Sequence, residues 1–345
     1  MITPDPRNTV LLVLIVPIVG LVLCAGLIIA MRPLLRQHAL ARPNERSSHK
    51  TPTPQGGGIA VMLASATAMM IGGELVVPSW TEATLVVFAA AFVLSTVGLI
   101  DDLWQIGAVP RLALQAAAVV FIFTMLPSQV RALPILPIWL ERPLLVLGLL
   151  WFVNLVNFMD GLDWMTVAEM LPVTAALAVF ALWGGASPGY GCIELALAGS
   201  LIGFAPFNRP VASLFLGDVG SQPIGLLTGW CLLELANRGH LVAALLLPLY
   251  YLADATITLF RRLANGEQIW TAHRSHFYQR ATDNGFTVMQ VVGWVFVLNI
   301  VLAGLAAVSM AADSSPADVV LLGLGAACVA VVLLQFSRQH IQHST

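Results

Sequence analysis

The most informative polar pattern in the sequence is Asn154-Leu155-Val156-Asn157-Phe158-Met159-Asp160-Gly161-Leu162-Asp163. Its Asn and Asp side chains recur at every third position, and they end an apolar run that begins at Leu144. Because residues three apart are neighbours on a helix surface, the pattern predicts a ladder of two amides and two carboxylates at a helix end. Such groups are costly at the end of a membrane helix and usually functional. The stretch therefore indicates a membrane helix that carries a site at one surface.

The composition of the whole chain supports a membrane protein. The chain has 345 residues, of which 58% are hydrophobic and 10% are charged, whereas a soluble domain has about 25% charged residues. Repeated apolar runs of roughly 20 residues are typical of transmembrane helices. The four cysteines lie scattered within apolar runs and lack the spacing of a metal site. We therefore expect a single integral-membrane domain, residues 1–345, that is all-α and polytopic, has the lipid bilayer as a partner and has no nucleic-acid partner.

The apolar runs predict about eleven transmembrane helices, the first of them a retained span and not a signal peptide. The predicted ranges are 10–31, 57–77, 83–100, 111–126, 143–159, 165–183, 191–207, 222–236, 241–260, 288–309 and 317–336.

The distribution of basic residues orients these helices. Twelve of the 16 Lys and Arg residues fall on one side and four on the other. The positive-inside rule then predicts the N-terminus outside and the C-terminus inside. The inner connections, which we expect to form the active site, are 32–56, 101–111, 160–164, 208–221 and 261–287.

Three clusters in the inner connections have both a plain and a functional interpretation. The segment from Arg42 to Lys50, followed by Gly56-Gly57-Gly58, is either a basic loop beside anionic lipids or a loop whose helix amides approach a phosphate. Asp101-Asp102 is either a metal or base site or a solvated helix end. Gly217-Asp218 is either backbone that is tight around a metal or phosphate, or a simple turn.

The longest inner loop adds a basic cluster. His273, Arg274 and His276 lie among other Arg residues with no cysteine nearby, which suits a polyphosphate better than zinc. Solvent-exposed structure is the plain alternative for these histidines. Asp254, about two turns inside the ninth predicted span, requires a partner or a role.

These side chains together define a reaction class. Carboxylates are the hard oxygen ligands that suit Mg²⁺, and Arg, Lys and His suit phosphate oxygens. On a cytoplasmic membrane face, the combination predicts phosphoryl transfer between a nucleotide and a lipid, in which catalysis is mostly positioning and charge neutralisation. The predicted oxygen ligands are Asp101, Asp102, Asp160, Asp163 and Asp218. A secondary transporter and a non-catalytic scaffold are the alternatives.

Five motifs occur in the order found in a known superfamily. They are Arg46 to Lys50, Asp101-Asp102, Asn154 to Asp163, Phe207-Asn208 with Phe215 to Ser221, and Ala272 to His276. On these residues the chain resembles the polyprenyl-phosphate N-acetylhexosamine-1-phosphate transferases, of glycosyltransferase family 4 type, and within them the members that initiate O-antigen. The run of consecutive histidines of the lipid I enzyme is absent, which argues against a muramyl-pentapeptide substrate.

The resemblance implies a specific reaction. A sugar-1-phosphate passes from a UDP-N-acetylhexosamine to undecaprenyl phosphate, which gives undecaprenyl-diphosphate sugar and UMP and initiates O-antigen or another surface polysaccharide. It implies Mg²⁺ as cofactor, with Mn²⁺ as the alternative, and a bacterial inner-membrane location with the active site facing the cytoplasm. A lipid I-type phospho-MurNAc-pentapeptide transferase is a further alternative, and the oligomeric state, including a homodimer, is left open.

The resemblance also implies residue roles. Catalytic roles fall to Asp101, Asp102, Asp218 and His276. Substrate-binding roles fall to Lys50, Asn157, Asp160, Asp163, Asn208, His273 and Arg274, and the metal ligands are Asp218 and Asp160.

Three residues depart from the family pattern. Trp164 stands where Gly is usual, and we expect it either to narrow the nucleotide pocket or to stack on the uracil. Gln55 and Ser213 stand where basic residues are common, so they remove positive charge near the phosphates.

Overall fold

The structure is a computed structural model that describes residues 6–41, 52–76, 82–125, 131–182, 188–268, 273–312 and 314–339. These residues form helices and one two-stranded antiparallel pairing, in which Leu40 faces Pro54. The helices are α1 (Pro6–His38), α2 (Gly57–Val76), α3 (Glu82–Trp104), α4 (Ala108–Met125), α5 (Ile138–Met159), α6 (Met165–Leu182), α7 (Pro188–Phe204), α8 (Asp218–Asn237), α9 (Leu241–Leu246), α10 (Leu249–Ala264), α11 (Phe277–Asp283), α12 (Val288–Ala312) and α13 (Ser315–Phe336). The strands are β1 (Leu40–Ala41) and β2 (Thr53–Pro54).

The predicted all-α fold is confirmed, because each predicted span coincides with helix. Within the described part of the chain, seven helices are long and apolar enough to cross a membrane. The helices α2 and α7 contain shorter apolar stretches. The count of eleven crossings and the orientation of the two termini stay predictions.

The predicted span 241–260 is not one helix. It is split into α9 and α10 at Leu247 and Pro248. Pro248 has no backbone N–H to donate to the preceding turn. A new helix starts after it, in which Leu252 N–H donates to Pro248 O at 3.0 Å. The short helix α11, inside the predicted loop 261–287, was not predicted either.

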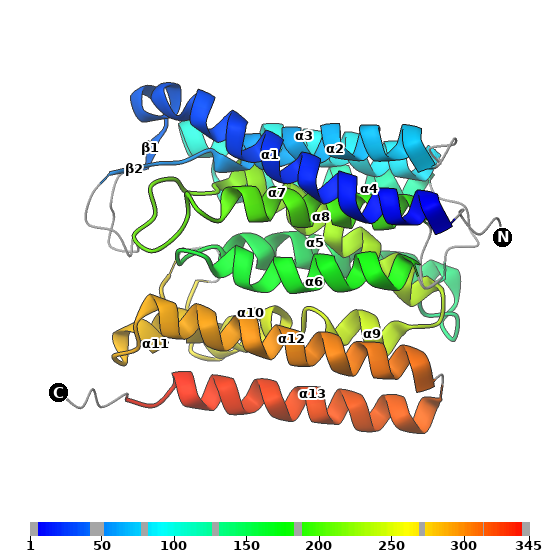
Figure 1. Ribbon diagram of the computed structural model, residues 1–345. Coiled ribbons are helices and arrows are strands. Elements are labelled where there is room, and N and C mark those ends of the chain that lie inside the picture. The colour runs from blue at the N-terminus through cyan, green and yellow to red at the C-terminus, as the bar shows by residue number, and fades with distance from the viewer. Residues whose placement is uncertain are drawn as a thin grey trace.

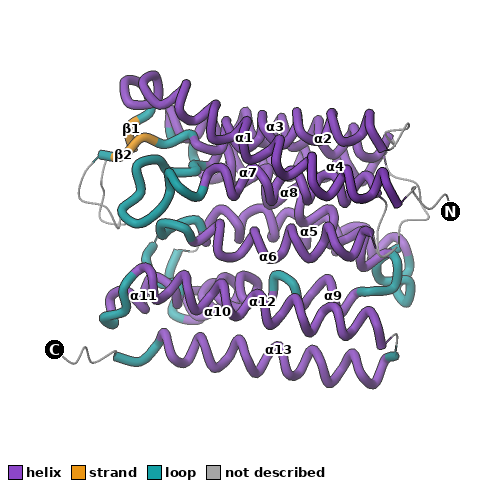
Figure 2. The backbone as a smooth tube through the Cα atoms, in the orientation of Figure 1, coloured by secondary structure: helices purple, strands orange, loops and turns teal. Residues whose placement is uncertain are grey.

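The helices run side by side, with their ends gathered at two faces of the molecule (Figure 1). In this view α1 begins on the right and α13 ends on the left, where β1, β2 and α11 also lie. The tube in Figure 2 shows that the long connection between α7 and α8 belongs to the same left-hand end. We call this end of the molecule, where β1, β2, α11 and the α7–α8 connection lie, the site end.

The helix α8 is the central element of the fold. Nearly all of its side chains are buried, and it packs against α3, α5, α2 and α9. Its first turn lies so close to α2 that a Cβ atom on Gly58 would be 2.3 Å from Gly220 Cα. The closeness of backbone to backbone explains the need for glycine at this point.

The glycine segment at the start of α2 does not present free amides to an anion. Gly57 N–H donates to Phe215 O at 2.9 Å, and Gly58 N–H donates to Leu216 O at 2.8 Å. The expectation that these amides approach a phosphate is therefore wrong in this structure. The segment instead fixes the loop that leads into α8.

Candidate active site

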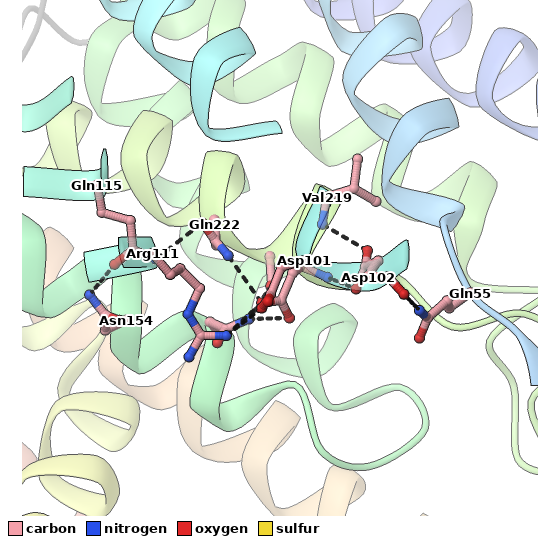
Figure 3. Close-up of polar contacts among 11 residues, drawn as sticks. Gln55, Asp101, Asp102, Arg111, Gln115, Asn154, Val219 and Gln222 are labelled. Carbon is pink, nitrogen blue, oxygen red and sulfur yellow. Dashed lines mark hydrogen bonds and ion pairs between the residues drawn. The ribbon is translucent and has the colours of Figure 1, made fainter. Parts of the chain in front are cut away.

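Asp218 is the centre of a polar cluster at the site end, and Figure 3 labels Asp101, Arg111 and Gln222 among the residues around it. It is the first residue of α8, and its side chain stays partly accessible. Asn157 Nδ2 donates to Asp218 Oδ1 at 2.7 Å, and Gln222 Nε2 donates to Asp218 Oδ2 at 3.0 Å. Arg111 Nη1 donates to the same Oδ2 at 3.2 Å. Donors from α4, α5 and α8 therefore converge on one carboxylate.

Arg111 joins Asp218 to the first residue of the acid pair. Its Nη1 lies 2.6 Å from Asp101 Oδ2 as well as 3.2 Å from Asp218 Oδ2. Two carboxylates close together repel each other unless a cation lies between them. The guanidinium supplies that positive charge, so the structure brings Asp101 and Asp218 together as predicted.

Asp102 points away from Arg111, toward the start of α8. Its Oδ1 accepts the backbone N–H of Asp218 at 3.0 Å, and its Oδ2 accepts the N–H of Val219 at 3.1 Å. A carboxylate at a helix N-terminus satisfies unpaired amides and the positive end of the helix dipole. Gln55 Nε2 donates to the backbone carbonyl of Asp102 at 2.6 Å. The predicted catalytic role of Asp102 stays a prediction, but in this arrangement the carboxylate positions Asp218.

The Asn and Asp ladder at the end of α5 divides between different contacts. Asn157 contacts Asp218 and also donates to Ser221 Oγ at 2.9 Å. Asn154, one turn deeper, donates to Gln115 Oε1 at 2.9 Å. Asp160 follows the last residue of α5 and accepts a hydrogen bond from Thr166 Oγ1. Of the four ladder residues, Asn157 is the one that donates a hydrogen bond directly to Asp218.

The pKa of the Asp160 carboxyl group is raised. Desolvation by the surrounding protein raises its pKa to about 7, against the hydrogen bond from Thr166, which lowers it. The negative charges of Asp218 and Asp163 raise the pKa further. A raised pKa next to other acids is expected where a metal ion would neutralise the group.

Asp163 and Asn208 hold backbone in place instead of pointing to an open site. Asp163 Oδ2 accepts the N–H of Ala212 at 2.9 Å. Asn208 Oδ1 accepts the N–H of Trp164 at 2.8 Å, and its Nδ2 donates to Leu214 O at 3.0 Å. The hydrogen bonds of both side chains hold the α7–α8 loop in place. Their predicted substrate contacts stay predictions.

Trp164 belongs to the same set of contacts. It has a φ of 63°, a conformation that glycine adopts easily and tryptophan rarely. Its indole Nε1 donates to Ala205 O at 2.6 Å, and the ring packs against the core. This placement gives no support to stacking on uracil and makes Trp164 a residue that fixes the α7–α8 loop.

Asp254 lies under the histidine loop and has the partner that its position in a span requires. Its Oδ1 is 3.2 Å from His276 Nδ1 and accepts the N–H of Phe277 at 3.0 Å. Its Oδ2 accepts the N–H of Tyr278 at 3.1 Å and the hydroxyl of Tyr250 at 3.2 Å. One carboxylate in α10 therefore caps α11 and orients the His276 ring.

The other basic residues of this loop lie around His276. The rings of His273 and His276 have centroids 4.8 Å apart, and Tyr278 stacks on His276 with centroids 5.7 Å apart. Arg274 lies on the rim, with Nη2 at 3.4 Å from Asp283 Oδ1. His273, Arg274 and His276 therefore form one cluster, as the sequence predicted. Lys50 lies outside the described residues.

The histidine cluster is joined to the end of α5. Tyr278 hydroxyl donates to Phe158 O at 3.0 Å. A Cβ atom on Gly161 would be 2.1 Å from that hydroxyl, so only glycine fits at this point. The contact places Tyr278, and with it the ring of His276, beside the C-terminal end of α5, which Asp160 follows.

The carboxylates are of the kind that could hold a divalent cation. No three Asp, Glu, His or Cys side chains of the described residues converge into a complete metal site. Mg²⁺ does not need one, because it commonly takes one or two protein carboxylates together with substrate phosphates and waters. The predicted ligands Asp160 and Asp218 are close enough that the negative charge of Asp218 raises the pKa of Asp160. The donor set therefore fits Mg²⁺.

Three residues of the cluster were not singled out from the sequence. They are Arg111, Gln115 and Gln222. The two glutamines left a signal, since each is a polar residue in an otherwise apolar helix and both are fully buried. Arg111 contacts Asp218, which lies 107 positions later in the chain, and no local sequence pattern reveals such a contact.

The chain matches proteins of one family. The family model for glycosyl transferase family 4 matches residues 84–236, which contain Asp101, Asn157, Asp160 and Asp218. A decaprenyl-phosphate N-acetylglucosaminephosphotransferase of Mycobacterium tuberculosis is 30% identical over 333 residues, with 86% of this chain and 81% of the relative covered. The chain belongs to glycosyl transferase family 4, and the resemblance to the polyprenyl-phosphate N-acetylhexosamine-1-phosphate transferases is confirmed. The nearer resemblance to members that initiate O-antigen stays a prediction.

Two further relatives show the range of the family around this chain. A probable undecaprenyl-phosphate N-acetylglucosaminyl 1-phosphate transferase of Bacillus subtilis is 24% identical over 290 residues, covering 79% of this chain and 80% of the relative. A phospho-N-acetylmuramoyl-pentapeptide-transferase of Mycolicibacterium smegmatis is 28% identical over 306 residues, covering 74% of this chain and 83% of the relative. The family membership and the apolar helices identify a multi-pass membrane transferase of bacterial type.

Proposed function

We propose that this protein transfers an N-acetylhexosamine-1-phosphate from a UDP-sugar to undecaprenyl phosphate at the cytoplasmic face of a bacterial inner membrane. The observation that carries the proposal is the cluster of Asp101, Arg111, Asn157 and Asp218 at the site end, beside the cluster of His273, Arg274 and His276. Acids that suit a divalent cation adjoin bases that suit a diphosphate. The relatives' names, which specify polyprenyl-phosphate acceptors and sugar-phosphate transfer, support the same reaction.

The proposed reaction exchanges one phosphoric anhydride for another. An oxygen of the lipid phosphate attacks the β-phosphorus of the UDP-sugar, the bond from that phosphorus to the bridging oxygen breaks, and the electron pair leaves with UMP. The lipid phosphate needs no strong base, because the second pKa of a phosphate monoester is about 6. Each oxygen of the Asp102 carboxylate accepts a hydrogen bond from a backbone N–H group. This arrangement supports direct attack over an aspartyl-phosphate intermediate.

Each cluster has a distinct task in this proposal. Asp218 and Asp160 would hold Mg²⁺, which neutralises phosphate charge when bound. Arg111 would balance the acids and face the phosphates, and Asn157 keeps Asp218 turned toward the site. His276 and Arg274 would bind the diphosphate of the donor, with His276 held by Asp254.

The direct test is a panel of UDP-sugars incubated with the purified protein, undecaprenyl phosphate and Mg²⁺, with UMP release as the readout. We expect UMP release with at least one UDP-N-acetylhexosamine and none when the lipid phosphate is omitted. Release only with UDP-MurNAc-pentapeptide would assign the chain to the lipid I-type reaction. No release with any donor, together with substrate uptake into proteoliposomes, would favour a transporter.

The raised pKa of Asp160 predicts a pH dependence of metal binding. The carboxyl group has a pKa of about 7 and must lose its proton to bind a cation. Binding is therefore favoured above that pKa, and the affinity falls as the pH drops through it. We expect the affinity for Mg²⁺ to fall by about tenfold between about pH 8 and about pH 6. Competition of Mg²⁺ against Mn²⁺ in electron paramagnetic resonance titrations measures this affinity.

The Asp160→Asn variant is the matched control for this pH effect. It should bind the cation more weakly at every pH, and its affinity should change much less with pH. An unchanged pH dependence in Asp160→Asn would show that another group is responsible.

A further inference from the structure

Three buried amides, all labelled in Figure 3, form a hydrogen-bonded series that ends at Asp218. Asn154 Nδ2 donates to Gln115 Oε1 at 2.9 Å, Gln115 Nε2 donates to Gln222 Oε1 at 3.1 Å, and Gln222 Nε2 donates to Asp218 Oδ2 at 3.0 Å. The three residues lie on α5, α4 and α8. We call Asn154, Gln115 and Gln222 the amide relay.

The direction of every hydrogen bond in the amide relay is fixed by the carboxylate at its end. An ionised carboxylate only accepts hydrogen bonds, so Gln222 must turn its NH₂ group toward Asp218. Its carbonyl oxygen then faces Gln115, which must donate, and the oxygen of Gln115 in turn faces the NH₂ group of Asn154. A flipped amide at any position would place two oxygens or two NH₂ groups against each other.

The burial of the relay makes its members depend on one another. Gln115 and Gln222 have no exposed surface, and Asn154 is 8% exposed. A buried polar group that loses its partner has no water to replace it. Burying three amides is costlier than burying apolar side chains of the same size. The arrangement therefore points to a task at its outer end.

We propose that the amide relay is a positioning device that holds Asp218 in the orientation in which it binds the divalent cation. Asn157 fixes Oδ1 of this carboxylate and Gln222 fixes Oδ2. Groups behind a metal ligand set its orientation, and their loss typically lowers metal affinity by about 10–100-fold. This inference rests on the proposed function, because it takes Asp218 as a metal ligand.

The test measures Mn²⁺ binding to the purified full-length protein by electron paramagnetic resonance, without substrate. Gln222→Met and Gln115→Met keep the size of the side chain and remove the hydrogen bonds. We expect the dissociation constant for Mn²⁺ to rise by about tenfold or more in Gln222→Met and by less in Gln115→Met. Since the residues act in series, the double variant should bind Mn²⁺ no more weakly than Gln222→Met alone.

The matched control is Asn299→Leu, which removes a buried amide that contacts Glu169 and lies outside the relay. It should leave the dissociation constant for Mn²⁺ within about twofold of the wild-type value. If Gln222→Met does not fold, Gln115→Met decides the question, because it leaves the contact of Gln222 with Asp218 in place. Wild-type Mn²⁺ binding in the folded relay variants, or losses that multiply in the double variant, would overturn the inference.

The same titration separates this inference from the proposed function. In the Asp218→Asn variant, Mn²⁺ binding should be lost. If Asp218→Asn binds Mn²⁺ as the wild type does, the proposed metal site is wrong. If Asp218→Asn loses Mn²⁺ binding but the relay variants bind Mn²⁺ as the wild type does, the metal site stands and the amide relay has no role in it.

Discussion

Replacement of Asp218 by Asn should lower the rate of UMP release by roughly 10³-fold or more, because metal stabilisation of phosphate charge is worth several kcal/mol and about 1.4 kcal/mol is a factor of ten. The carboxylate is the point where donors from α4, α5 and α8 converge. The amide of Asn has one poor ligand oxygen and no charge, so it would neither hold a cation nor attract Arg111. UMP release at saturating UDP-sugar and Mg²⁺ measures the loss.

The fold should survive this change. Asp102 accepts the backbone N–H of residue 218, which Asn also has. The thermal unfolding midpoint in detergent should therefore stay close to that of the wild type. Asp318→Asn, the same substitution at the start of α13, should keep full activity. Activity within about tenfold of wild type in a folded Asp218→Asn would contradict the proposed metal site.

Replacement of Asp254 by Asn should lower the rate of UMP release by about 10²-fold, although Asp254 would not touch the substrate. A group displaced by about 1 Å from its productive position can cost about 10²-fold in rate. The NH₂ group of Asn would face one of the N–H groups of His276, Phe277 or Tyr278 that the carboxylate now accepts. The ring of His276 would lose its fixed orientation.

A double-mutant cycle tells positioning apart from a general loss of structure. If Asp254 acts through His276, Asp254→Asn combined with His276→Ala should be no slower than His276→Ala alone. Tyr250→Phe removes a single hydroxyl contact to the same carboxylate and should have a much smaller effect. Losses that multiply in the double variant would show that Asp254 and His276 act independently.

The helices were predictable because their signal is local. Each apolar run coincides with helix, and the acids Asp101, Asp160 and Asp218 named from the sequence lie near one another. The division into α9 and α10 at Pro248 was not readable, because Pro17, Pro172 and Pro223 lie inside continuous helices. The short helix α11 was not readable either, because it depends on Asp254, which lies 23 residues before Phe277.

The roles of single side chains were less predictable than their location. Asp102, Asp163 and Asn208 carry chemistry-bearing groups, and a sequence motif does not distinguish a substrate contact from a hydrogen bond to distant backbone. Trp164 looked like a pocket residue, whereas its indole N–H bonds to Ala205 O. These distinctions depend on which helix lies opposite, and that is set by the packing of the whole bundle.

The cap of α8 by Asp102 has a consequence for how the protein is made. The two residues that meet there are separated by 116 positions in the chain, and Arg111 meets Asp218 across 107. While only the first five helices have been synthesised, the acid pair has nothing to cap and Arg111 lacks one of its two carboxylates. The reaction centre therefore comes into being late in biosynthesis, when α8 reaches its place between helices that were inserted before it. The protein can therefore be catalytically active only after α8 has packed between the earlier helices.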